Sequence, residues 1–566
     1  MISSRTLFPT HPFVEFPLAD INQTIAQRFE QQACRYPERL AVKAGKRSLT
    51  YDELNATANG VAHAILGHAG AATQQVAILC NADVSMIVAI LGALKTGKAF
   101  APLNPQLPKI KLHEIFATLG SCLVLSDENN FAAAMEIAGD VKQVLNVDAL
   151  DRHLCRENLK LSVSPDALAY INFTSGSTGA PKGVMWNHRC ELFGIRTKTN
   201  ALHIAPTDRV SLLRANNVGA ARDMFLALLN GAALIVLDFG AGGLATLGDW
   251  LRGEDISVFT CVATVFRQSV SGAGGTEKFP AVRLIHIGGE PIYKTDVDLF
   301  RRHFSDDCLF VSRYSISETQ AVSYFFMNQD TKIHGDHVPV GYPLEGNEVL
   351  ILDDDGRETA AGTIGEIAVR SPYLALGYWC QPELTRAKFL DNFQGAGTRT
   401  YLTGDLGYRL PDGCLIQVGR KDFQAKIKGF KVEVTAIEAA LNEIPSVRQA
   451  VVVARQDAAK GSRLIAYVVP QDPAAAGVSQ LRTQLKSRLP AYMIPDSFVM
   501  TESLPLNSGG KVDRSALPAL EGNQRAVGTT FVEPRDAVEE ALVISTPWAL
   551  TTILPNWAGT RCSRRG

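Results

Sequence analysis

The sequence predicts an α/β fold, with a large N-terminal domain of parallel-rich sheets wrapped by helices and a small α+β domain at the C-terminal end. Its 566 residues exceed what one hydrophobic core usually serves. Over residues 49–369, short β-branched runs alternate with longer helical patterns, which is typical of βαβ units and parallel sheets. Beyond Arg420 a compact pattern of helix, strand, strand and helix indicates the second domain.

The individual elements follow from hydrophobic spacing. In the first domain, β-branched runs predict strands at residues 75–80, 122–125, 233–237 and 284–287, and a longer apolar run predicts a helix at residues 84–95. Beyond Gly365 the predicted strands are more closely spaced along the sequence. Turns are expected before this point, at residues 353–356, and after it, at residues 411–413. In the second domain we expect helices at residues 435–442 and 479–488, and strands at residues 449–454 and 463–469.

Composition excludes several classes of protein. Hydrophobic residues make up 46% of the chain, charged residues 20%, and the net charge is −1, so a nucleic-acid partner is not expected. The 10 cysteines are scattered without a C-x-x-C pair, which argues against a disulfide framework or a zinc site. No export signal and no apolar run of about 18 residues is found. The expected location is therefore the cytoplasm, without a membrane partner.

The strongest chemical signal is a loop rich in glycine and hydroxyl groups. Residues 173–183 read FTSGSTGAPKG and directly follow an apolar strand at residues 167–171. Backbone N–H groups and hydroxyls in such a loop can surround phosphate oxygens, while Lys182 adds a positive charge. The spacing differs from the G-x-x-x-x-G-K-[ST] loop, because Lys182 follows a proline and precedes a glycine. The alternative interpretation is a flexible turn without a ligand.

This loop resembles the signature loop of the adenylate-forming, or AMP-binding, superfamily. The resemblance covers roughly residues 20–520 and implies an AMP-binding domain at residues 1–420 and a small domain at residues 421–520. Two of the matching segments, residues 489–495 and 510–514, resemble the adenylation domains of nonribosomal peptide synthetases in particular. The other matching segments are residues 49–54, 94–103, 288–290, 365–378, 401–406, 419–422, 489–495 and 510–514.

The resemblance implies an enzyme that uses ATP and Mg²⁺ to activate a small carboxylic acid as its acyl-AMP. Such a reaction needs cations and oriented donors around phosphate. Lys511, on the small domain, would contact the substrate carboxylate and the α-phosphate, and Glu318 would hold Mg²⁺. Tyr314 would stack on adenine, Asp405 would accept hydrogen bonds from ribose, and Arg420 would contact phosphate or ribose. Further nucleotide contacts are expected from Thr174, Ser175, Gly176, Ser177, Thr178, Gly179, Lys182, Gly289, Glu290 and Ser317.

Members of this superfamily rotate the small domain between an adenylating and a thioester-forming arrangement. By resemblance, the small domain here is mobile and its hinge is Asp422, since a few junction residues can absorb such a backbone change. In the second arrangement a loop that includes Lys428 and Gly429 would replace Lys511 at the active site. Taken without the resemblance, Lys426 and Lys428 predict only a solvated strand edge.

The acyl pocket departs from the pattern of enzymes that select α-amino acids. The aspartate that pairs with the substrate ammonium is replaced by Val218, next to Gly219. An unpaired buried ammonium is costly, so an ordinary α-amino acid is not expected, and a hydroxy, keto, aryl or fatty acid fits better. The same alignment places Arg222 and Arg313 on pocket positions, where two guanidinium groups favour a second anionic or strongly polar group. Alternatively, Arg222 pairs with Asp223 or another neighbouring carboxylate.

The nucleotide motif departs from the family too. Ser312, Ser315 and Ile316 differ from the usual residues around Tyr314, which predicts weaker adenine recognition. A degenerate, inactive nucleotide-binding remnant is therefore the non-enzymatic alternative. The presence of Lys182, Glu318, Asp405 and Lys511 argues against it.

Residues 521–566 are interpreted as a linker and a truncated or frameshifted start of a carrier domain. Residues 531–542 resemble the first helix of such a domain, but no Gly-Gly-x-Ser attachment site follows. The codons required by Trp557 and its neighbours permit a Leu-Gly-Gly-Asp-Ser motif in the frame one nucleotide earlier, which indicates a frameshift between about residues 543 and 548. The expected acyl acceptor is thus the phosphopantetheine thiol of a separate carrier protein or CoA. Transfer to CoA would make the protein a free-standing acid:CoA ligase, which is the alternative enzymatic interpretation.

Overall fold

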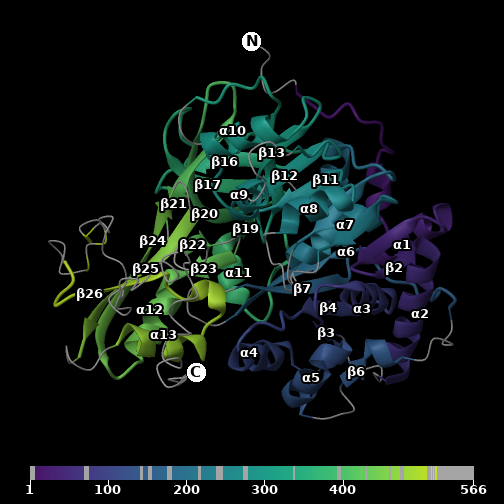
Figure 1. The fold of residues 1–566 in the computed structure, drawn as a ribbon, viewed down its shortest axis with the longest axis horizontal. Helices are drawn as coiled ribbons and strands as arrows, with labels where there is room; N and C mark the ends of the chain where they lie inside the picture. Colours follow the sequence, from purple (N-terminus) through teal and green to yellow (C-terminus); the bar gives the residue numbers. More distant parts are fainter. Residues whose placement is uncertain are drawn as a thin grey trace, which may run out of the picture.

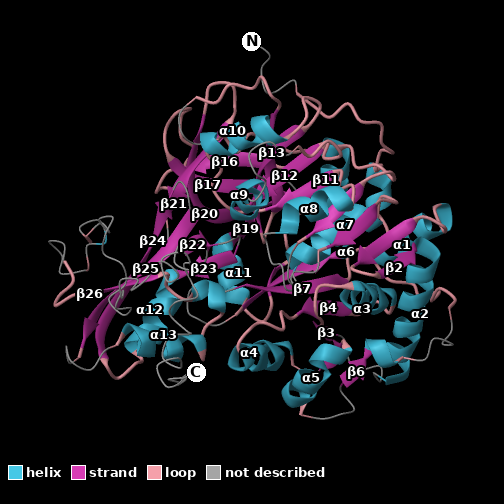
Figure 2. Ribbon diagram, in the orientation of Figure 1, coloured by secondary structure: helices cyan, strands magenta, loops and turns pink. Residues whose placement is uncertain are grey.

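The computed structural model describes most of the chain between residues 7 and 518. The described residues are 7–68, 75–120, 122–139, 144–150, 156–174, 181–213, 218–237, 246–271, 278–334, 338–391, 397–421, 424–427, 430–457, 461–471, 477–505, 512, 514 and 517–518. Within them, helices cover both large sheets of an N-terminal domain, and a smaller unit follows at the C-terminal side (Figures 1 and 2). This mixed α/β organisation confirms the fold class predicted from the sequence.

The largest sheet in the described part of the chain is predominantly parallel. Its nine strands lie in the order β15-β14-β13-β12-β11-β9-β10-β1-β2, and the pairs from β13 to β1 are parallel. Antiparallel pairs occur at both edges, where hairpins add β14, β15 and β2. The strands are β1 (Leu40–Ala44), β2 (Arg47–Thr50), β9 (Arg209–Leu212), β10 (Ala233–Val236), β11 (Val258–Cys261), β12 (Leu284–Gly288), β13 (Leu309–Ile316), β14 (Gln320–Met327) and β15 (Tyr342–Pro343).

A second sheet has seven described strands in the order β18-β8-β7-β4-β3-β5-β6. The run from β7 to β6 is parallel, as βαβ units require, whereas β7, β8 and β18 pair antiparallel. Its strands are β3 (Gln75–Leu79), β4 (Ala99–Pro102), β5 (Cys122–Ser126), β6 (Val144–Asn146), β7 (Leu168–Thr174), β8 (Lys182–Asn187) and β18 (Gly377–Tyr378).

The third sheet is antiparallel and leads into the small C-terminal domain. It contains β16 (Glu348–Leu352), β17 (Gly365–Ser371), β19 (Phe389–Asp391), β20 (Arg399–Arg409) and β21 (Leu415–Arg420). Beyond it, β22 (Gln424–Ile427) pairs with β23 (Phe430–Glu433), and a separate sheet contains β24 (Val447–Asp457), β25 (Gly461–Pro470) and β26 (Ser497–Met500). The small domain has its own apolar core.

The helices begin where polar caps satisfy the first backbone N–H groups. Asp83 accepts hydrogen bonds from the backbone N–H groups of Ser85 and Met86 at the start of α3, and Asn187 accepts one from Cys190 at the start of α6. The helices are α1 (Ile25–Arg35), α2 (Tyr51–His68), α3 (Val84–Lys95), α4 (Lys109–Leu119), α5 (Phe131–Ala138), α6 (His188–Leu202), α7 (Val218–Leu228), α8 (Leu247–Gly253), α9 (Ala263–Ser271), α10 (Lys294–His303), α11 (Pro382–Lys388), α12 (Val434–Asn442) and α13 (Val478–Lys486).

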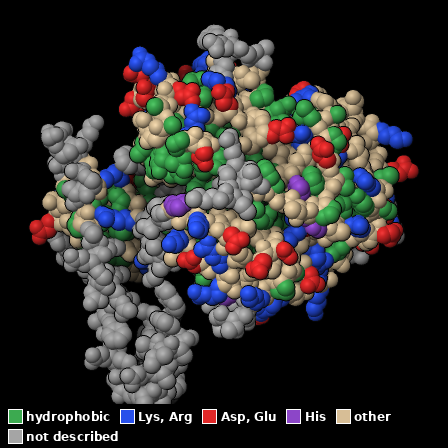
Figure 3. Space-filling view, turned by 90° about the horizontal axis from the view of Figure 1, so that it is seen from above, with side chains coloured by type: hydrophobic (Ala, Val, Ile, Leu, Met, Phe, Trp, Pro, Cys, Tyr) green, Lys and Arg blue, Asp and Glu red, His purple; other side chains and the backbone are tan. Residues whose placement is uncertain are grey.

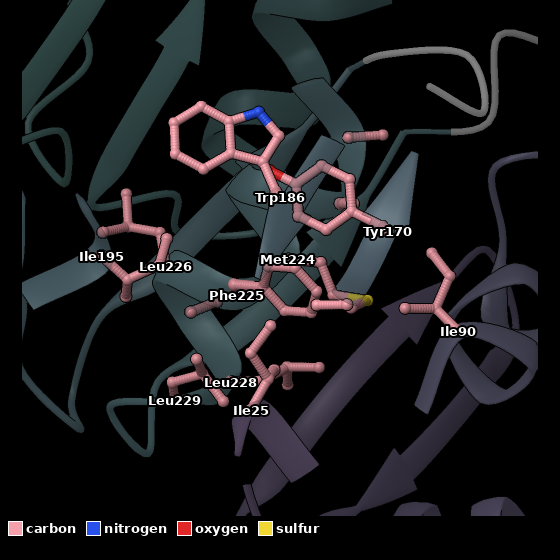
Figure 4. Close-up of a cluster of buried hydrophobic side chains, with 14 of the residues drawn as sticks. Ile25, Ile90, Tyr170, Trp186, Ile195, Met224, Phe225, Leu226, Leu228 and Leu229 are labelled. Atoms are coloured by element: carbon pink, nitrogen blue, oxygen red, sulfur yellow. The ribbon is translucent and has the colours of Figure 1, made fainter. Parts of the chain in front are cut away.

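The main apolar core joins the two parallel-rich sheets through the helices between them. Figure 4 shows its centre, where Met224 and Phe225 of α7 lie between Leu228 of the same helix and the rings of Tyr170 and Trp186. Tyr170 and Trp186 belong to β7 and β8, the hairpin that carries the predicted phosphate loop, and both are fully buried. The loop is therefore anchored in the most deeply buried part of the protein.

The surface agrees with the near-neutral net charge. In Figure 3, acidic and basic side chains are interspersed over the visible face. No helix in the described part of the chain is long and apolar enough to cross a membrane.

Gly92 of α3 provides a test of helix packing. A Cβ atom at this position would lie 2.6 Å from Cγ1 of Val61 in α2, whereas one at Gly67 in α2 would meet nothing within 4 Å. We expect Gly92→Ala to lower the free energy of unfolding by about 1–3 kcal/mol because it overpacks the interface. Gly67→Ala is the matched control and should be neutral or slightly stabilising. Chemical denaturation measures both, and equal stabilities would contradict the close approach of α2 and α3.

Candidate active site

The predicted phosphate loop connects two antiparallel strands. Thr174 ends β7, Lys182 begins β8, and the two residues are paired in the sheet. The Thr174 hydroxyl donates a hydrogen bond to the Lys182 carbonyl at 3.5 Å. The hairpin brings both ends of the loop to one edge of the sheet. The loop residues Ser175, Gly176, Ser177, Thr178 and Gly179 lie outside the described part of the chain.

Three residues predicted to contact the nucleoside meet between two sheets. The Tyr314 hydroxyl on β13 donates a hydrogen bond to Oδ2 of Asp405 on β20 at 2.6 Å. Arg420 on β21 forms an ion pair with Oδ1 of the same carboxylate, and the two residues face each other in the β20–β21 ladder. Burial raises the pKa of Tyr314, and the negative charge of Asp405 raises it further. The structure thus brings together an aromatic ring, a buried carboxylate and a guanidinium.

Glu318, the predicted Mg²⁺ ligand, lies in the turn between β13 and β14. Its side chain is 1% exposed, and Oε1 accepts a hydrogen bond from the Tyr378 hydroxyl at 2.9 Å. No group of three or more potential metal-ligating side chains occurs among the residues that the structure describes. A single carboxylate fits a Mg²⁺ ion that is held mainly by phosphate oxygens and water. Glu318 is therefore suited to an ion that arrives with its nucleotide.

The backbone of this turn is held from the side of the protein core. The Ser317 carbonyl accepts a hydrogen bond from Nε1 of Trp186 at 3.2 Å and one from Nη2 of Arg222 at 3.5 Å. The neighbouring predicted contacts Gly289 and Glu290 follow β12, where Gly289 adopts a φ of +86° that glycine tolerates. The turn that carries Glu318 is consequently fixed by side chains from β8 and α7.

A buried carboxylate, Glu191 of α6, organises this region. Its Oε2 atom accepts hydrogen bonds from the Tyr170 hydroxyl, from Nε2 of Gln320 at 2.8 Å and from Nε of Arg222 at 3.4 Å. Glu191 is fully buried and Arg222 nearly so, and the guanidinium carbon lies 4.8 Å from the ring centroid of Trp186. Arg222 therefore pairs with a neighbouring carboxylate, which is the alternative that the sequence left open.

Backbone geometry supports the contact between Gln320 and Glu191. Gln320 has a φ of +64°, which is unusual for a residue other than glycine, and it directly follows the Glu318 turn. A Cβ atom at position 194 would lie 1.6 Å from Oε1 of Gln320, so any larger residue there would displace the Gln320 side chain from its present position. The contact between Gln320 and Glu191 thus depends on Gly194.

Lys198 is a candidate site residue that the sequence reasoning missed. It lies in α6, is 5% exposed and has no hydrogen bond or ion pair with any described residue. Burial, together with the positive charges of Arg222 and Arg313, lowers its pKa from 10.5 to about 7. A mostly polar helix does not distinguish a buried lysine from a solvated one. The burial follows from tertiary packing of α6 on α7 and β14.

The other predicted pocket positions lie on neighbouring elements. Gly219 belongs to α7, as does the backbone of Val218, whose side chain is outside the described atoms. Arg313 pairs with Tyr324 across β13 and β14 and with Gly288 across β12 and β13. The hinge, the thioester loop and the catalytic lysine stay predictions. Their residues lie outside the described part of the chain, namely Asp422, Lys428, Gly429 and Lys511.

Comparison with known proteins identifies the family. A family model for AMP-binding enzymes matches residues 29–379, and a model for the C-terminal domain of AMP-binding enzymes matches residues 436–511. The chain belongs to the AMP-binding enzyme family.

Curated relatives of this AMP-binding enzyme include synthases of surfactin and tyrocidine. It is 34% identical over 529 residues to surfactin synthase subunit 1 of Bacillus subtilis, and these cover 92% of the chain and 14% of the relative. It is 30% identical over 531 residues to tyrocidine synthase 1 of Brevibacillus parabrevis, covering 92% and 47%. The chain therefore spans less than half the length of these relatives.

Solved structures share its fold. An o-succinylbenzoate CoA synthetase from Bacillus subtilis matches with a TM-score of 0.75 and 23% identity, covering 87% of this chain and 98% of the other. A fused adenylation and carrier di-domain from Klebsiella oxytoca matches with a TM-score of 0.73 and 24% identity, covering 84% and 93%. These similarities confirm that the chain has the same fold as these two proteins.

The pairing of Glu191 with Arg222 predicts a stability effect. Arg222→Met leaves a buried carboxylate without its cation, so we expect a loss of about 3–5 kcal/mol in the free energy of unfolding. The double variant Arg222→Met/Glu191→Gln should recover much of that loss, because the uncompensated charge is gone. Arg189→Met is the control, since its pair with Asp166 is partly exposed and is worth less than about 1 kcal/mol. Denaturation curves for the four proteins would contradict the pairing if Arg222→Met behaved like the control.

The depressed pKa of Lys198 predicts a pH dependence of stability. Below pH 7 the lysine is charged in both the folded and the unfolded chain. Burial of this charge then lowers the free energy of unfolding by its full amount. Between pH 7 and 10.5 the unfolded chain binds more protons, so this cost declines as pH rises. Lys198→Met should therefore have a higher free energy of unfolding than the unmodified protein at pH 6, and the difference should shrink toward pH 9.5. A gain independent of pH would show that Lys198 keeps an ordinary pKa.

Proposed function

We propose that the chain uses ATP and Mg²⁺ to convert a carboxylic acid into an acyl-AMP and then passes the acyl group to a thiol. The observation that carries this proposal is the arrangement of Tyr314, Asp405 and Arg420 beside the turn that presents Glu318. A ring that can stack on adenine, a carboxylate that can accept from ribose hydroxyls and a guanidinium that can reach phosphate are what the nucleotide half-reaction needs.

In this reaction a carboxylate oxygen attacks the α-phosphorus of ATP. A new phosphorus–oxygen bond forms, the bond to the bridging oxygen breaks, and pyrophosphate leaves with its electron pair. Glu318 would hold Mg²⁺, which neutralises charge on the phosphate oxygens when bound. Lys182 and the loop 174–182 would face the departing pyrophosphate, and Lys511 would contact the carboxylate and the α-phosphate. Asp422 would serve as the hinge, and residues Lys428 and Gly429 would enter the site for thioester formation.

The domain roles follow from the family. Residues 1–420 would form the AMP-binding domain and residues 421–520 the small domain. Residues 521–566 would be a linker and the start of a carrier segment, and the thiol of a carrier protein or of CoA would accept the acyl group. The identity of 34% to surfactin synthase subunit 1 favours a carrier protein. Val218 replaces the usual aspartate, which supports an acid without an α-ammonium group.

The proposal predicts release of pyrophosphate that depends on a carboxylic acid. In a hydroxylamine-trapped assay with ATP and Mg²⁺, we expect a hydroxy, keto, aryl or fatty acid to be activated far better than the proteinogenic amino acids. Lys511→Ala should lower the rate by roughly 10²-fold or more, because it removes a cation from the reacting oxygens. Lys486→Ala, also on the small domain but exposed, is the matched control and should retain full activity.

Absence of acid-dependent pyrophosphate release in the unmodified chain would overturn the proposed reaction. Full activity in Lys511→Ala would remove that lysine from the mechanism. Robust activation of a common amino acid would show that Val218 does not occupy the counter-ion position. Incubating the acyl-AMP with CoA or with a phosphopantetheine-loaded carrier then identifies the acceptor.

A further inference from the structure

Lys198 occupies the inner face of α6 together with Glu191. The two residues are seven positions apart, which places them on the same helix face about 10 Å apart along the axis. Between them lie Gly194, where Gln320 approaches, and the buried Ile195. The lysine therefore points to the side on which α6 packs against α7 and β14, the side of the predicted acyl-pocket positions.

Among the described residues, cations outnumber carboxylates around Lys198. The groups close enough to influence it are Arg222, Glu191, Arg313 and Asp223. Arg222 and Glu191 form an ion pair with each other. The remaining groups are the two cations Lys198 and Arg313 and the carboxylate of Asp223, which accepts a hydrogen bond from Thr260 at 3.5 Å. Counted over these described groups alone, a protonated Lys198 leaves one positive charge in excess.

A further polar atom lies in the same cluster. The Tyr324 hydroxyl is buried and finds no hydrogen-bond partner among the described residues. Tyr324 pairs with Arg313 across β13 and β14, so it lies beside one member of the cluster. Burial raises the pKa of its hydroxyl. Buried polar groups normally have partners, so a hydroxyl donor and an ammonium donor together indicate a binding site for an acceptor.

We propose that Lys198 is a specificity-determining residue that binds an anionic group at the far end of the acyl substrate, so that the ligase activates a dicarboxylic acid. The inference rests on the proposed function and names its substrate class. One carboxylate reacts with ATP, and the other is bound by Lys198 with support from Arg313 and the Tyr324 hydroxyl. A carboxylate supplies the compensating charge that the buried cluster lacks and the acceptor that both donors need.

A purely structural lysine is the competing explanation. Lys198 would then serve only to moderate the charge of Glu191, yet Oε2 of Glu191 already accepts three hydrogen bonds, one of them from the cation Arg222. A structural role would leave the choice between mono- and dicarboxylic acids unchanged, whereas a binding role would alter it.

The test compares matched pairs of acids in the pyrophosphate assay. The pairs are succinate with butyrate, glutarate with pentanoate, adipate with hexanoate and isophthalate with benzoate. We expect the dianionic member of at least one pair to be activated with a higher kcat/KM, by roughly ten- to hundred-fold. Lys198→Met keeps the side-chain length without the charge and should abolish that preference. Arg196→Met is the matched control on α6, because Arg196 pairs with Glu345, and it should preserve the preference.

Proton uptake gives a second readout. At pH 8 Lys198 is largely neutral, and a bound anion raises its pKa, so binding of the preferred diacid takes up a proton. Calorimetry in buffers of different ionisation enthalpy should detect this uptake in the unmodified ligase and not in Lys198→Met. Thermal melting confirms that each variant is folded.

The outcomes separate the two proposals. Acid-dependent pyrophosphate release without preference for any dianionic acid overturns the inference and leaves the proposed function standing. A dianionic preference that persists in Lys198→Met removes Lys198 as its cause and overturns the inference as well. No pyrophosphate release with any carboxylic acid overturns the proposed function itself.

Discussion

The buried carboxylate of Glu191 is the interaction on which the geometry of the site depends. It joins β7 through Tyr170, α7 through Arg222 and β14 through Gln320. Arg222 in turn supports the Ser317 carbonyl, one residue before Glu318. Because a buried charge is stable only with its partners in place, loss of any donor affects all three elements. The position of the predicted Mg²⁺ ligand is therefore set by an ionic network inside the core.

Much of the scaffold was predictable, because local hydrophobic spacing determines it. Residues 84–95 were expected as a helix and form α3 with the same bounds, since a continuous apolar run of that length must be buried. The strands at residues 75–80 and 284–287 likewise correspond to β3 and β12 within one residue at either end. In the small domain, β24 extends from Val447 to Asp457, beyond the expected residues 449–454, because pairing with β25 orders its ends.

The network itself was not predictable from local sequence. Glu191 lies in a polar stretch of α6 that reads as a solvated helix face, and only tertiary packing reveals its three donors. The same holds for Lys198, whose burial depends on α7 and β14. For Arg222 the sequence left two environments open, and the distance to Glu191 favours pairing with a carboxylate. The positive φ of Gln320 has no sequence signal either, since glycine or asparagine usually occupies such positions.

The predicted nucleotide and acyl sides of the site differ in whether their buried charges have hydrogen-bond or ion-pair partners. On the nucleotide side, Asp405 is matched by Tyr314 and Arg420, so that a ligand must exchange one set of hydrogen bonds for another. Near the predicted acyl-pocket positions, Lys198 is buried without a hydrogen bond or ion pair to any described residue, and burying an unpaired charge is costly. Proteins retain destabilising groups of this kind where function requires them. An anion bound at Lys198 would relieve this cost, and the same α6 helix carries Glu191, so acyl recognition and the position of the Glu318 turn share one rigid element.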